Sequence, residues 1–129
     1  MIYVEGGIPI MSDIFEILDK LGAETDDAVE RFMDDEEMYL KYVRDFPEEG
    51  SMKKLIDAVA AKDYDAAEKA VHALKGIVNN LGFIPLADAS IDMLEELRDD
   101  NAAAALEAFE DVKKEYDRFC AAIKAWREE

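Results

Sequence analysis

The chain has a single histidine, His72, and its neighbours suit an imidazole that acts as a nucleophile. Lys75 and Gly76 follow three and four positions later, so on an α-helix both lie about one turn away. A neutral ring nitrogen can attack phosphorus, and a nearby ammonium group offsets charge on the phosphoryl oxygens. A mid-helix glycine costs about 1 kcal/mol relative to alanine, but it leaves room for a reactant. The three residues predict a phosphoryl-transfer site, with His72 as acceptor, Lys75 as electrostatic assistant and Gly76 as the residue that keeps access open.

Other uses of a histidine fit the sequence less well. A carboxylate di-iron bundle needs two Glu-x-x-His pairs, whereas this chain has one histidine and Lys69 where the glutamate would stand. A Ser-His-Asp or Cys-His hydrolase is disfavoured because no Gly-rich nucleophile elbow is present, and Cys120 beside Phe119 has the pattern of a small packed thiol. One cysteine cannot form an internal disulfide. Residues 24–37 are rich in carboxylates but contain no glycine, which argues against a Ca²⁺ loop and for a solvated face. We therefore expect neither metal nor cofactor.

The residues around His72 follow a helical period. Over 64–82 the apolar positions form one stripe, and His72 shares a neighbouring stripe with Glu68, Lys75 and Asn79. This spacing predicts a helix with an exposed imidazole on the flank of a bundle. The core stripe of this helix is Ala67, Val71, Leu74, Val78 and Leu81.

The rest of the chain is predicted to be helical as well, with helices at 36–46, 51–61, 86–98 and 102–127 and short helices before residue 36. The predicted N-caps are Ser12, Thr25, Asp63 and Asn101, with Gly82 ending one helix and Pro85 opening the next. In 36–46 the expected core stripe is Met38, Tyr39, Tyr42, Val43 and Phe46. No segment shows sustained period-2 alternation, and the connections are short. The prediction is an all-α fold: an antiparallel four-helix bundle with short N-terminal helices packed across it.

Composition limits the partners. The 129 residues suit one domain, and 15 Lys+Arg against 32 Asp+Glu give a formal charge of −17. Such a chain is not expected to bind nucleic acid or an anionic membrane, and no apolar run is long enough for a membrane span. Residues 1–10 lack a basic region and contain Gly6, Gly7 and Pro9, so we predict an extension rather than a secretory signal. Residues 11–129 would then form one helical domain, with the cytoplasm as the default location.

The motif His72-Ala73-Leu74-Lys75-Gly76, with Gly82 six positions after Gly76, resembles the signature of the histidine-containing phosphotransfer (HPt) domain. The resemblance extends over most of 13–125. It implies that His72 accepts a phosphoryl group from a receiver-domain aspartate and passes it to another receiver. It also implies a monomer, with Mg²⁺ only on the partner receiver. The residues that the resemblance assigns to partner docking are Ala73, Ile77, Asn79 and Asn80.

The resemblance also sets two finer expectations. Leu94 belongs to a core stripe at the position where many members place a polar residue facing the histidine, so Asn79 is the candidate to orient the ring. Ile77 is either part of an apolar docking patch or a partly buried packing residue.

The predicted function is a phosphocarrier of a multistep His–Asp phosphorelay. It is not an enzyme with kinase activity of its own, because the chain has no nucleotide-binding glycine loop and no kinase signature. The alternative is an adaptor or inhibitor that binds a receiver without chemistry. A third possibility is a helical bundle in which His72 is incidental.

Overall fold

The computed structural model describes residues 13–128, which form helices joined by short turns and contain no strand. The all-α prediction is therefore confirmed for this part of the chain, while the predicted extension at 1–10 lies outside it. The elements are α1 (Ile14–Lys20), α2 (Thr25–Arg31), α3 (Glu36–Asp45), the 3₁₀ turn η2 (Phe46–Glu48), α4 (Ser51–Ala60), α5 (Tyr64–Leu81), α6 (Ile84–Arg98) and α7 (Ala102–Arg127).

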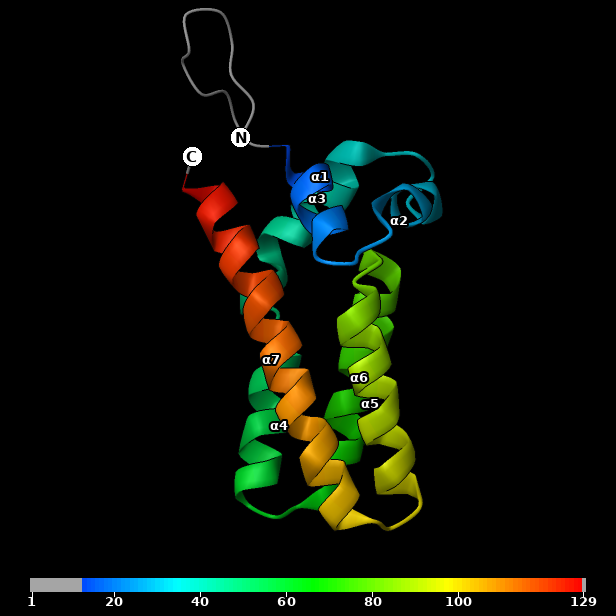
Figure 1. Cartoon of the computed structure of the whole chain (residues 1–129), viewed down its shortest axis with the longest axis vertical. Helices are drawn as coiled ribbons and strands as arrows, with labels where there is room; N and C mark the ends of the chain where they lie inside the picture. Colours follow the sequence, from blue (N-terminus) through cyan, green and yellow to red (C-terminus); the bar gives the residue numbers. More distant parts are fainter. Residues whose placement is uncertain (1–12, 129) are drawn as a thin grey trace, which may run out of the picture.

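Helices α4 to α7 form the bundle, and α1 to α3 lie at the end where α5 turns into α6 (Figure 1). Helix α6 packs along both α5 and α7, and α4 packs along α5. Val71, Leu74 and Val78 of α5 have no solvent-exposed surface, and neither do Leu86 and Met93 of α6. The predicted four-helix bundle, with short N-terminal helices across it, is thus confirmed.

The predicted boundary residues of α5, α6 and α7 are confirmed. The carboxylate of Asp63 accepts a hydrogen bond from the N–H of Ala66, and the side chain of Asn101 accepts one from the N–H of Ala104. Pro85 stands in the first turn of α6, where its missing N–H has no cost.

Two capping predictions were wrong. Helix α1 is capped by Asp13, which accepts from the N–H groups of Phe15 and Glu16, rather than by Ser12, which lies outside the described residues. Thr25 is the first residue of α2 and is 1% exposed. Its N–H and hydroxyl donate to one oxygen of Asp19, at 3.1 and 2.8 Å. Thr25 therefore makes a tertiary contact with α1 and does not act as the N-cap of α2.

The predicted core stripe of α3 was too wide. Tyr39, Val43 and Phe46 are buried, but Met38 and Tyr42 are 47% and 54% exposed. A helix that lies across the end of a bundle contacts it along a narrow face, and apolar residues at the edge of the stripe remain in solvent. Ile56 of α4 and Leu106 of α7 are exposed apolar residues as well.

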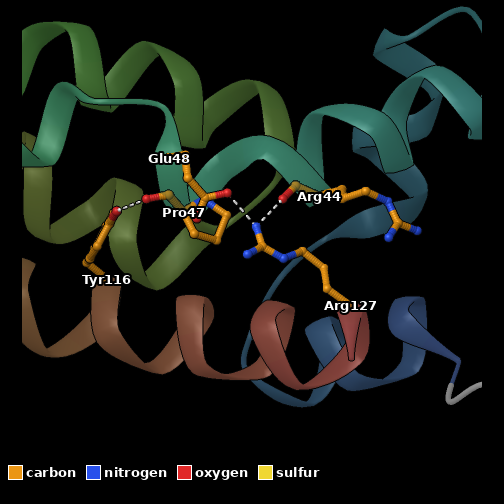
Figure 2. A network of polar contacts seen from close by, with 5 residues as sticks. All are labelled: Arg44, Pro47, Glu48, Tyr116 and Arg127. Carbon is orange, nitrogen blue, oxygen red and sulfur yellow. Dashed lines mark hydrogen bonds and ion pairs between the residues drawn. The ribbon is translucent and has the colours of Figure 1, made fainter. Parts of the chain in front are cut away.

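A polar network fastens the segment between α3 and α4 to the last helix (Figure 2). The guanidinium of Arg127 donates to the backbone carbonyl of Arg44 at 2.9 Å and pairs with Glu48. The hydroxyl of Tyr116 donates to the carbonyl of Pro47 at 3.1 Å. These contacts hold η2, and with it Phe46 and Glu48, against α7.

Candidate functional site

Helix α5 carries the candidate site on the side opposite its core face. Val71 and Leu74 are buried on either side of His72 in sequence, whereas the imidazole of His72 is exposed. Lys75 is partly buried and Gly76 is exposed. The structure therefore brings the three predicted site residues together on one accessible helix surface, with His72 and Gly76 exposed to solvent and Lys75 partly buried.

The short N-terminal helices fix the C-terminal end of α5. Its last carbonyl groups lack partners within the helix, and residues from α2 and α3 supply them. The Arg31 guanidinium donates to the carbonyl of Asn79 at 2.6 Å, and the Tyr39 hydroxyl donates to that of Leu81 at 2.7 Å. Beyond the helix, the N–H of Glu24 donates to the carbonyl of Gly82 at 2.8 Å. The cationic arginine also suits the negative end of the helix dipole.

Gly82 is required at this junction for two reasons. Its φ of +78° lies in the left-handed region that favours glycine, and a Cβ there would stand 2.6 Å from the carbonyl oxygen of Glu24. Gly76 is different, because a Cβ at Gly76 would meet no atom within 4 Å outside its own helix backbone and chain neighbours. Packing inside the chain therefore does not explain why position 76 is glycine.

Charged side chains surround His72 on its own helix. Lys69 and Lys75 lie three residues before and after it, and neither pairs with a carboxylate among the described residues. Glu68, one turn before His72, pairs with Arg98 of α6 at 4.0 Å. Lys69 was not predicted as a site residue, although its position three residues before His72 already placed it within one helical turn of the imidazole.

Three of the four predicted docking residues line two separate grooves. Ile77 and Asn80 line an open groove of about 790 Å³ between α5 and the segment from α2 to η2, which we call the α3 groove. Ala73 lines a second depression, between α4 and α5, and Asn79 is exposed between His72 and the end of the helix. Ile77 is partly buried against the core, as one of its two interpretations predicts, and it also lines the α3 groove. Its role in docking stays a prediction.

The α3 groove combines apolar walls with an acidic rim. Phe32, directly after α2, and Met38 and Tyr42 of α3 contribute apolar surface, and the ring centroids of Phe32 and Tyr42 lie 5.5 Å apart. Carboxylates of Asp45 and Glu49 stand at the same groove. Met38 and Tyr42 were predicted to lie in the core, so their place in this groove was not predicted; it follows from their exposure.

Two expectations about the site's surroundings can be compared with the structure. Leu94 is 2% exposed, as predicted for a core residue. Within residues 13–128 the Asn79 side chain makes no hydrogen bond to the imidazole, and the Asn79 backbone carbonyl accepts one from Arg31. Its role in orienting His72 stays a prediction.

Cys120 is a buried free thiol, which agrees with its interpretation as a packing residue. Within residues 13–128, no group of three or more His, Cys, Asp or Glu side chains is arranged to hold a metal ion. None of the helices in this range has the length and apolar content that a membrane span requires.

Comparison with protein families assigns the chain. The model of the Hpt domain matches residues 13–122, which is most of the 129 residues, and the chain belongs to the Hpt domain family. Members of this family are phosphocarriers that interact with receiver domains in His–Asp phosphorelays and are not kinases. Comparisons with curated proteins and with solved structures found no match.

Proposed function

We propose that this protein is a phosphocarrier in which His72 accepts a phosphoryl group from the aspartate of one receiver domain and passes it to another. The observation that carries the proposal is the open space at Gly76 beside an exposed imidazole. Packing inside the chain does not require a glycine at position 76, so we attribute the glycine to a partner that must come close to His72.

The chemistry needs one nucleophile and one leaving carboxylate. The lone pair of the unprotonated ring nitrogen forms the N–P bond as the P–O bond of the aspartyl phosphate breaks. The aspartate leaves as a carboxylate, and the imidazole becomes a cation that can release its remaining N–H proton to solvent. Lys75 offsets charge on the three phosphoryl oxygens during the transfer. Mg²⁺ would be supplied by the receiver. The return step to a second receiver is the same reaction in reverse.

Docking would use the exposed face of α5 together with the α3 groove. Ala73, Ile77, Asn79 and Asn80 follow His72 on α5 and would contact a receiver placed over this helix. The apolar groove wall would take apolar receiver side chains, while the acidic rim favours basic ones. We further propose that the protein is monomeric and acts in the cytoplasm.

Label transfer from a receiver phosphorylated with ³²P tests the proposal. Acid-labile, alkali-stable label should appear on the chain and be absent from His72→Gln, while receiver binding by this variant persists. Label that remains in the variant would contradict the assignment of His72. Binding without any transfer to the native chain would favour the adaptor or inhibitor instead.

A further inference from the structure

The Glu68–Arg98 ion pair connects the candidate site to the neighbouring helix. Arg98 Nε lies 4.0 Å from a carboxylate oxygen of Glu68, and the side chains are 53% and 41% exposed. Most of the other ion pairs among residues 13–128 lie within a single helix, as Lys20 with Glu16 does. The Glu68–Arg98 pair instead joins a carboxylate of α5 to a cation of α6.

The placement of Glu68 gives this pair a consequence for the site. Glu68 precedes His72 by four residues on α5, so the two side chains are neighbours on the helix surface. A phosphoryl group on His72 brings a charge of about −2, as other phosphorylated side chains do. An uncompensated carboxylate at roughly 7 Å would repel it enough to change an equilibrium by about three- to tenfold in dilute salt.

We propose that Arg98 is a positioning residue for phosphohistidine formation, acting through Glu68. By holding and neutralising this carboxylate, Arg98 removes the nearest like charge on α5 from the phosphoryl group. Lys69 and Lys75 are then the remaining charged residues within one turn of His72 on α5, although the chain as a whole has a charge of −17. The inference rests on the proposed function of His72 and adds a residue that does not itself need to touch the phosphoryl group.

A double-mutant cycle tests the inference at equilibrium. The chain and one phosphorylated receiver domain are mixed, and the ratio of phosphohistidine to phosphoaspartate is measured after it becomes constant. Since docking affinity does not alter the equilibrium between the free species, this ratio reports the stability of the phosphohistidine. Arg98→Ala should lower the ratio about three- to tenfold. Glu68→Gln should leave it at or above the native value, and the double variant should match Glu68→Gln within about twofold.

The controls separate this role from a structural one. Lys20→Ala breaks a similarly exposed pair on α1, at 3.2 Å, and should leave the ratio unchanged. The effect of Arg98→Ala should shrink in 1 M salt, where the Debye length is about 3 Å. A native ratio for Arg98→Ala, or a double variant as low as Arg98→Ala, would overturn the role of Arg98 through Glu68 while leaving the proposed function intact. Absence of label from the native chain would overturn both.

Discussion

Replacing Gly76 with alanine should raise stability and lower the rate of phosphoryl transfer. The new Cβ would meet no atom within 4 Å outside the local helix, so alanine adds helix propensity without a steric cost. The gain is about 0.8–1.0 kcal/mol, which for a chain of this length raises the melting temperature by about 3–5 °C. The same methyl group would occupy the space through which a phosphoryl donor reaches His72.

Two measurements on the same variants check this prediction. Urea unfolding and calorimetry give the stability change, and rapid-quench transfer from a phosphorylated receiver gives the rate. Ala121→Gly, on the exposed face of α7, is the matched control. It should lower the free energy of unfolding by about as much as Gly76→Ala raises it, and it should transfer at the native rate. Gly76→Gln should slow transfer more than Gly76→Ala. If Gly76→Ala is stabilised but transfers at the native rate, the glycine does not serve access to His72. If Gly76→Ala is destabilised, the added methyl group meets other atoms and the space at position 76 is not open.

Three further predictions concern residues of the site and of the elements that position it. Tyr39→Phe leaves the carbonyl of Leu81 without its partner and should cost about 1–3 kcal/mol in urea unfolding at pH 7. Burial raises the pKa of the Tyr39 hydroxyl above its ordinary value of 10.0, so its contribution is complete below pH 10 and is lost as the pH rises further. The native chain should therefore lose more stability than Tyr39→Phe above pH 10. Lys75→Ala should slow transfer about ten- to a hundredfold in rapid-quench assays with little change in melting temperature, and an unchanged rate would remove Lys75 from the mechanism. Ile77→Asp should weaken receiver binding in titration calorimetry but permit phosphorylation of His72 by phosphoramidate, and native affinity would contradict docking at the α3 groove.

Local signals in the sequence were sufficient to predict most of the bundle. Asp63 and Asn101 cap helices that have long, regular apolar stripes. A helix that buries one face can be predicted from such a stripe without knowledge of the rest of the fold. The exposed position of His72 followed from the same period, because it lies off the stripe that contains Val71 and Leu74.

The prediction was poorer where distant parts of the chain meet. Thr25 was assigned as a cap since nothing local indicates that Asp19 accepts its hydrogen bonds. Arg31 donates to the carbonyl of Asn79, 48 residues away, and no pattern within α2 predicts this contact. Met38 was placed in the core because periodicity gives the direction of an apolar face but not the width of the surface that covers it.

The central claim is that His72 carries a phosphoryl group between receivers, and onward transfer tests it most directly. The chain is labelled with ³²P, separated from its donor and mixed with a second, unphosphorylated receiver and Mg²⁺. The account predicts that label leaves the chain and appears on the receiver as alkali-labile aspartyl phosphate, faster than it is lost from the chain alone. Label that stays on the chain, or is released as inorganic phosphate at the receiver-free rate, would contradict the carrier function.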